Sequence, residues 1–235
     1  MVRNPDEKIM LAEHYFEIRH AASGSFLDVR GYVADYIRDN KFLPHWRIER
    51  NVVHFHDNPE TTNKEGAFAG YKSIGYVTFN PETRNFFVDR AGAFWRLLQK
   101  NKHYNLPSLE RFGARTKVFL PTNEDFEIIN EKVFHSLYTE TARKVLGKNE
   151  TDVQFIVESM EEGFDVRVSG GPIHKREAGT LLKFDHSDFE KAGFFVDLDY
   201  YQTKSLDHKD IPHLLRKAVD LTWAKVEELA AVIGV

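Results

Sequence analysis

Apolar and polar positions alternate most clearly in residues 194–201. The positions that would share one face of an extended strand are Phe194, Val196, Leu198 and Tyr200. Apolar residues then recur at helical spacing from about Ile211 to Ile233, and Pro212 lies in the first turn, where a missing N–H costs nothing. This pattern predicts a strand followed by a long helix whose broad apolar face packs on a sheet.

The same order of strand, polar turn and long helix occurs in the middle of the chain, over Phe112–Leu120 and Asn123–Leu146. We therefore predict an α+β protein of two halves, each a mainly antiparallel sheet packed by long helices. The division is placed after the middle helix, giving an N-terminal half of residues 1–148 and a C-terminal half of residues 149–235. One sheet shared by both halves and two separate sheets are both compatible with the pattern.

The other elements follow from periodicity and turn residues. In the N-terminal half we predict strands at Glu13–His20, Phe68–Phe79 and Asn85–Val88, helices at Phe26–Asn40 and Ala91–Gln99, and an extended run or hairpin at Trp46–Asp57. In the C-terminal half we predict strands at Val153–Met160, Phe164–Val168 and Thr180–Phe184.

Composition narrows the class of protein. A net charge of −4 and a pI near 6.3 argue against a general nucleic-acid binder, which needs a basic surface. The absence of cysteine excludes disulfides, thiolate catalysis and cysteine-ligated metal centres. No apolar run approaches the roughly 20 residues that span a bilayer, and the N-terminal residues lack the apolar core of a signal peptide. We therefore expect a cytoplasmic protein without a membrane partner.

Three short segments carry a resemblance to a known family. They are Val77–Phe87 with the Trp95 segment, the Arg-x-Gly-x-Arg pattern of Arg111–Arg115 followed by Leu120-Pro121, and the Asp-hydrophobic-Asp strand Val196–Tyr200. In this order and spacing they resemble a sporadically distributed, functionally uncharacterised prokaryotic family of α+β proteins. The resemblance implies the layout in two halves, with the last strand before a C-terminal helix. It implies no catalytic residues.

The sharpest candidate for metal binding is His54-Phe55-His56-Asp57. On a strand, His54 and His56 project from one face about 7 Å apart, a spacing that can hold a divalent metal ion. Asp197 or Asp199 could supply a further ligand if the two strands are neighbours. The alternatives are two histidines on a solvated strand face, and aspartates that are solvated or ion-paired with Arg111 or Arg115 of a neighbouring strand.

Arg111, Arg115 and Lys117 would form a basic ladder on one strand face. Such a ladder could bind a phosphate, a carboxylate-rich ligand or single-stranded nucleic acid. Solvated or ion-paired side chains are the alternative explanation, and they are commoner on sheet surfaces.

No phosphate-binding loop, serine nucleophile elbow or His-Glu-x-x-His motif is present. The leading prediction is therefore a non-catalytic binding or interaction protein. The aromatic content of 13% motivates a protein partner or a homo-oligomer. The first alternative is a metal-dependent hydrolase that uses His54 and His56 with Asp197 or Asp199. The second is nucleic-acid or anion binding through Arg111, Arg115 and Lys117.

Overall fold

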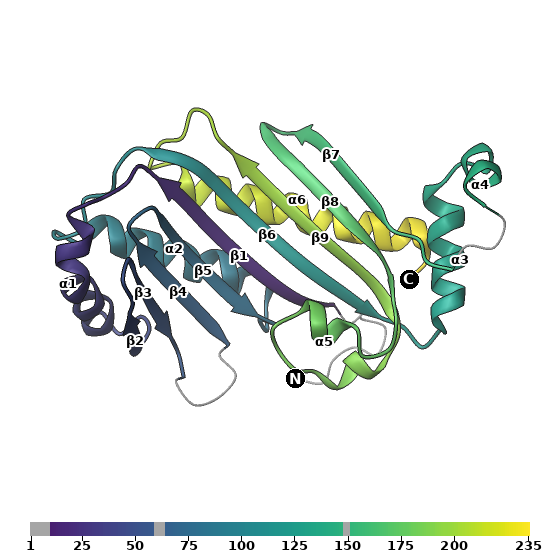
Figure 1. Cartoon of the computed structure of the whole chain (residues 1–235), viewed down its shortest axis with the longest axis horizontal. Coiled ribbons are helices and arrows are strands. Elements are labelled where there is room, and N and C mark those ends of the chain that lie inside the picture. Colours follow the sequence, from purple (N-terminus) through teal and green to yellow (C-terminus); the bar gives the residue numbers. More distant parts are fainter. Residues whose placement is uncertain (1–9, 59–63, 148–150) are drawn as a thin grey trace.

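Residues 10–58, 64–147 and 151–235 are described by a computed structural model of the chain. In these residues all strands join one antiparallel sheet in the order β2-β3-β4-β5-β1-β6-β9-β8-β7 (Figure 1). The strands are β1 (Leu11–His20), β2 (His45–Ile48), β3 (Val52–His56), β4 (Glu65–Gly70), β5 (Ser73–Phe79), β6 (Leu109–Pro121), β7 (Phe155–Glu161), β8 (Phe164–Ile173) and β9 (Gly193–Gln202).

The helices are α1 (Phe26–Asp39), α2 (Arg84–Lys100), α3 (Phe126–Leu137), α4 (Glu140–Leu146), α5 (Ala178–Leu181) and α6 (Ile211–Ile233), with a short 3₁₀ helix η1 (Ser187–Glu190). In the described ranges, no helix combines the length and the apolar character that crossing a membrane requires.

The prediction of a separate sheet in each half is wrong, although the α+β class holds. β6 of the N-terminal half pairs with β9 of the C-terminal half, from Phe112 to Pro121, and thereby joins the strands of both halves. Because the partner strands lie far apart in the sequence, alternation within either strand could not reveal the pairing. The predicted division between residues 148 and 149 falls in the stretch 148–150, which lies outside the described residues.

The sheet consists of two copies of one topological unit. In the first unit, β1 at the centre is followed by α1, then β3, β4 and β5 return from the edge to β1, and α2 follows. In the second unit β6, α3, β7, β8, β9 and α6 take the same places. Because β1 and β6 pair antiparallel, an approximate two-fold axis passes through the centre of the sheet.

The helices of the two units keep equivalent positions. α2 and α6 each bury a tryptophan against β1, where Trp95 contacts Phe16 and Trp223 contacts His14. In α1 and α3 the positions that face the core correspond at an interval of one hundred residues. They are Phe26 and Phe126, Val29 and Ile129, Val33 and Val133, and Ile37 and Leu137. The recurrence supports a structural repeat rather than a chance similarity of topology.

The two units differ at the outer edge of the sheet. In the first unit β2 lies between α1 and β3 in the chain, and it pairs with the outer edge of β3. In the second unit the described residues at the same place form α4, and β7 ends the sheet. The second unit also has an insertion between β8 and β9, which carries α5 and η1.

One face of the sheet is covered by helices and the other is largely open. α2 and α6 lie behind the sheet in Figure 1 and enclose the main apolar core. The insertion with α5 and η1 lies in front and covers one end of the open face. There a second apolar cluster includes Leu11, Phe119, Leu182 and Phe189.

Several predicted elements are confirmed and some are corrected. The strand before the last helix and that helix itself are confirmed as β9 and α6. Residues Asn85–Val88 belong to α2 rather than a strand, because Phe87 and Val88 pack on its buried face. Residues Thr180–Phe184 form no strand. The helix predicted over Asn123–Leu146 breaks at Tyr138, whose backbone is extended and whose hydroxyl donates to the Gln154 carbonyl at 2.7 Å.

A buried ion pair fastens α2 to the sheet. The Arg90 guanidinium donates to both carboxylate oxygens of Glu65 at 2.8 and 2.5 Å and to the Phe42 carbonyl at 2.9 Å. Tyr76 donates its hydroxyl to the same carboxylate. Removal of Glu65 would leave the guanidinium and the phenol without their acceptor in a mostly buried site.

We expect Glu65→Ala to lower the free energy of unfolding by about 3 kcal/mol. This is the low end of the losses seen when one partner of a buried ion pair is removed, because Arg90 keeps contact with solvent. The matched control is Asp89→Ala, which breaks an exposed ion pair between α2 and Arg216 of α6 and should cost about 1 kcal/mol or less. Urea denaturation of both variants makes the comparison. Equal losses would contradict the structural role of the buried pair.

His14 is a second buried polar group in the core. Its Nδ1 is paired with the Thr116 hydroxyl at 2.9 Å, and its ring stacks on Phe87. Complete burial lowers the pKa of His14 from 6.5 to about 3. The folded state therefore keeps a neutral imidazole at a pH where the unfolded chain binds a proton.

Because its folded pKa is depressed, the contribution of His14 to stability is complete above the unfolded pKa. It is lost as the pH falls toward 3. Between about pH 6 and pH 4 the free energy of unfolding should therefore fall by about 1.4 kcal/mol per pH unit from this residue. Urea denaturation of wild type and His14→Gln at several pH values measures the difference. Parallel pH profiles would show that His14 does not carry this dependence.

Candidate functional site

The open face carries the predicted basic ladder and the predicted acidic pair on neighbouring strands, because β6 pairs with β9. Arg115 donates from Nε to Asp197 at 2.8 Å and makes a second hydrogen bond to the same carboxylate. Arg111 donates to Asp199 at 3.0 Å and lies 3.5 Å from Glu17 of β1. The ion-paired interpretation of these residues is confirmed.

The Arg-x-Gly-x-Arg pattern has a steric explanation. A Cβ added to Gly113 would lie 2.6 Å from a guanidinium nitrogen of Arg111, so the missing side chain gives this guanidinium room to lie across the strand. Tyr201 stands opposite Gly113 in the register, and the Arg111 guanidinium lies 4.8 Å from the centre of its ring. The glycine thus allows Arg111 to reach Asp199 and Tyr201 together.

Lys117 and Glu13 complete the network where the insertion covers the sheet. Lys117 donates to the Leu181 carbonyl at 2.9 Å, and the Glu13 carboxylate accepts from the Lys183 backbone N–H at 2.6 Å. Burial raises the pKa of Glu13, against the effect of the Lys183 N–H and the lysine charges. This burial could not be predicted from the local pattern around Glu13, because the covering segment comes from a distant part of the chain.

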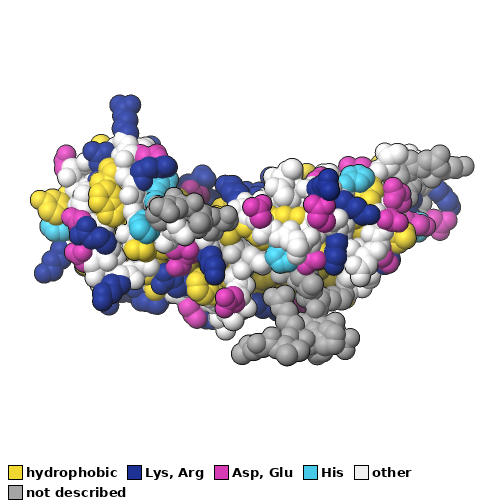
Figure 2. Space-filling view, turned by 90° about the horizontal axis from the view of Figure 1, so that it is seen from below, with side chains coloured by type: hydrophobic (Ala, Val, Ile, Leu, Met, Phe, Trp, Pro, Cys, Tyr) yellow, Lys and Arg dark blue, Asp and Glu magenta, His cyan; other side chains and the backbone are white. Residues whose placement is uncertain are grey.

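The ladder is therefore not a free anion site. Arg111, Arg115 and Lys117 each already donate to an oxygen of the protein. Figure 2 shows basic and acidic side chains intermingled along one side of the molecule, without a broad basic field. Nucleic-acid binding needs such a field to displace counterions.

We expect anion binding at this face to appear only when the carboxylates are neutralised. The double variant Asp197→Asn/Asp199→Asn removes the paired carboxylate of Arg115 and leaves Arg111 with Glu17 alone. Sulfate should therefore raise its melting temperature more than that of the wild type. Thermal unfolding in sulfate against chloride at equal ionic strength measures the effect. An equal response of both proteins would show that the aspartates do not occupy the arginines.

The structure does not bring the two parts of the predicted metal site together. His54 and His56 lie on β3, and Asp197 and Asp199 lie on β9, with β4, β5, β1 and β6 between them. Five strand spacings of about 4.8 Å place the two groups roughly 24 Å apart. Within the described ranges, no three or more His, Cys, Asp or Glu side chains are grouped to hold a metal ion. A hydrolase site made from both pairs is not assembled.

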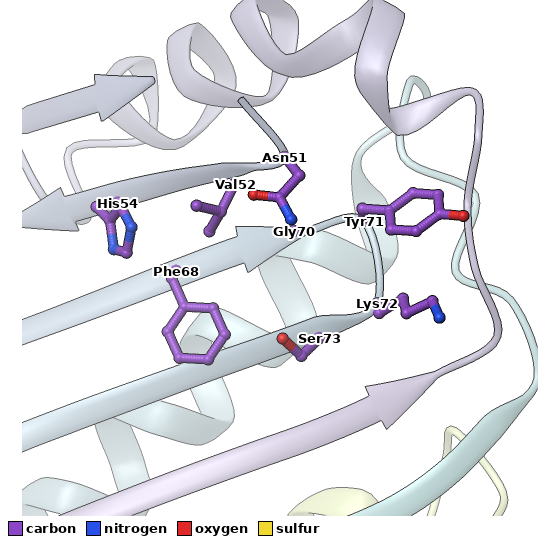
Figure 3. Close-up of a pocket in the computed structure, with 8 residues that line it drawn as sticks. All are labelled: Asn51, Val52, His54, Phe68, Gly70, Tyr71, Lys72 and Ser73. Carbon is purple, nitrogen blue, oxygen red and sulfur yellow. The ribbon is translucent and has the colours of Figure 1, made fainter. Parts of the chain in front are cut away.

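The histidines instead border two shallow hollows in the open face of β3, β4 and β5. One has a volume of about 320 Å³ and runs from His54 and Phe68 to the turn at Tyr71 and Lys72 (Figure 3). The other has about 390 Å³ and is bordered by His56 together with His54 and Phe68. In both, the glycines of β4 leave open the space that a side chain would fill.

His56 has a partner that the sequence analysis did not identify. His45 of β2 stands directly opposite His56, and their rings are nearly parallel with centroids 6.0 Å apart. Burial lowers the pKa of His56, and the neighbouring His45, Arg47 and His54 act in the same direction while Asp57 opposes them. Only the register of the β2–β3 hairpin could reveal this pair.

An apolar groove of about 630 Å³ lies beside β7 on the helix-covered side of the sheet. Its apolar lining consists of Leu137, Tyr138, Phe155, Ile156, Val157, Val168, Leu229 and Val232. On the edge strand itself Ile156, Val157 and Met160 are 64%, 51% and 80% exposed. Within the described residues, this part of the molecule therefore presents an unpaired strand edge and an apolar groove side by side.

Comparison with known proteins gives no assignment: no family model matches the chain, and no curated protein matches it. The resemblance carried by the Arg111–Arg115 pattern stays a prediction. The function of the chain must therefore be inferred from the geometry of its own residues.

Proposed function

We propose that the protein is a binding protein that accepts an extended segment of a partner protein along the outer edge of β7. The observation that carries this proposal is the unequal ending of the two units. The outer edge of β3 is paired with β2, whereas the equivalent edge of β7 has no strand partner in the described part of the chain. An added segment would take the place that β2 takes in the first unit.

The edge has the properties of a pairing surface. Natural sheets usually protect an edge with prolines, charged side chains (lysine above all), bulges or a very short strand. β7 has seven residues without proline or lysine, and its charged residues are Glu158 and Glu161. Its exposed backbone groups can hydrogen-bond an extended peptide, as in strand addition to a sheet.

The groove indicates which side chains the partner contributes. On the helix-covered face of β3, Val53 and Phe55 are buried and α1 packs over the strand. On the same face of β7, Val157 is half exposed beside the groove, and α3 packs mainly on β8, β9 and α6. Alternate apolar side chains of a bound strand would fill this groove, and burial of each would contribute about 1.5–3 kcal/mol.

The two alternatives have less support. A hydrolase that combines His54 and His56 with Asp197 or Asp199 requires residues that lie on strands far apart in the sheet. Anion binding by Arg111 and Arg115 requires that the existing ion pairs break first.

Selection from a displayed library of random peptides tests the proposal. We expect the immobilised protein to enrich peptides with apolar residues at every second position. Val157→Lys should weaken their binding by about tenfold or more, because it places a charge beside the groove. The matched control is Ile48→Lys, the same kind of substitution on β2 at the opposite edge of the sheet, and it should leave binding unchanged.

Two results would contradict the proposal. One is no enrichment of any peptide over a blank surface, and the other is enriched peptides that bind Val157→Lys as tightly as wild type. If the protein instead forms a dimer that Val157→Lys dissociates, the occupant of the edge is a second copy of the chain. Light scattering of the selection samples identifies that outcome.

A further inference from the structure

We propose that His45 and His56 form a two-histidine site for a transition-metal ion on the open face of the β2–β3 hairpin. This site does not depend on the β7 edge. It differs from the site predicted from the sequence, which uses His54 and His56 of a single strand.

The strand register places His45 and His56 directly opposite each other. Residues directly opposite on antiparallel strands have Cβ atoms about 4.5–5.5 Å apart, closer than two residues on one face of the same strand. The rings of His45 and His56 are 6.0 Å apart at their centroids and inclined by 16°. Two imidazoles that each bind one ion at about 2.0–2.1 Å through nitrogen need a similar separation. A small rotation about the side-chain bonds therefore brings a nitrogen of each ring to a common ion.

The hairpin that carries the pair is held in place. The Arg30 guanidinium of α1 donates to the Glu49 carbonyl at 3.0 Å and to the Arg50 carbonyl in the turn between β2 and β3. α1 also packs against both strands. The two histidines therefore do not depend on ion binding for their register.

The surroundings favour a transition metal over Mg²⁺ or Ca²⁺. The donors are two imidazole nitrogens, which suit Cu²⁺, Ni²⁺ and Zn²⁺, whereas Mg²⁺ and Ca²⁺ require oxygen ligands. The positive charge nearest in the register, Arg47, is paired with Glu49 at 2.7 Å. The hollow of about 390 Å³ beside His56 leaves space for water or a small ligand at the remaining coordination positions.

Calorimetric titration with Cu²⁺, Ni²⁺ and Zn²⁺ tests the proposal. We expect one ion per chain, with Cu²⁺ bound most tightly. His45→Ala and His56→Ala should each weaken binding by about tenfold or more, because a single imidazole remains. His54→Ala should retain binding. The matched control is His213→Ala, which removes an exposed histidine of α6. The electron paramagnetic resonance spectrum of the Cu²⁺ complex should show coupling to two nitrogens in the wild type and to fewer in either ligand variant.

Two outcomes would overturn the proposal. Binding that survives in His45→Ala but disappears in His54→Ala would place the ion on β3 alone. Binding that is equal in wild type and in the His45→Ala/His56→Ala double variant, or no binding of any of the three ions, would show that the pair is not a metal site. Circular dichroism of each variant checks that the fold is unchanged.

Discussion

The structure depends on the pairing of β1 with β6. These strands lie at the centre of the sheet and join two units of the same topology, so each unit completes the edge that the other would expose. The helices α2 and α6 of the two units both pack a tryptophan on β1. The central pairing therefore sets the order of the strands. That order in turn sets where the helix-covered core lies and which strands form the two outer edges. Unlike β2, the edge strand β7 is neither short nor covered by a helix in the manner of α1.

The two faces of the sheet follow different physical rules. The helix-covered face is apolar, and the buried His14 on it pairs its Nδ1 with the Thr116 hydroxyl. The open face balances its charges on neighbouring strands, where Arg111 is ion-paired with Asp199 and Arg115 with Asp197. Partly exposed pairs of this kind contribute about 0–1 kcal/mol each. They set the charge pattern of the face more than its stability.

The sequence predicted what is local. Periodicity identified β9 and α6. The extended segment Trp46–Asp57 was also predicted, with a single run and a hairpin both left open, and it is the hairpin of β2 and β3. The sequence failed where distant segments decide the outcome. A short apolar run at Phe87-Val88 is compatible with either a strand or a helix, and its packing in α2 decides between them. The repeat was missed because only a few apolar positions of α1 and α3 recur, at an interval of one hundred residues.

The candidate sites illustrate the same limit. His56 was identified, but its partner His45 lies on another strand, and register is not readable from either strand alone. For Asp197 and Asp199 the sequence left a metal site, a solvated face and ion pairing with Arg111 or Arg115 open, and the pairing of β6 with β9 decides for the ion pairs. The position of β7 at the edge of the described sheet could not be predicted, since it depends on the order in which distant strands pair rather than on a residue of β7.

Residue-resolved amide hydrogen exchange of the protein alone tests the central claim most directly. The account predicts that amides of β1 and β6 exchange only through global unfolding and with equal protection. It also predicts that every second amide of β7, the ones that point away from β8, exchanges as fast as a solvent-exposed loop. The account would be contradicted if β1 and β6 belonged to separately unfolding units, or if all β7 amides were as protected as those of β6.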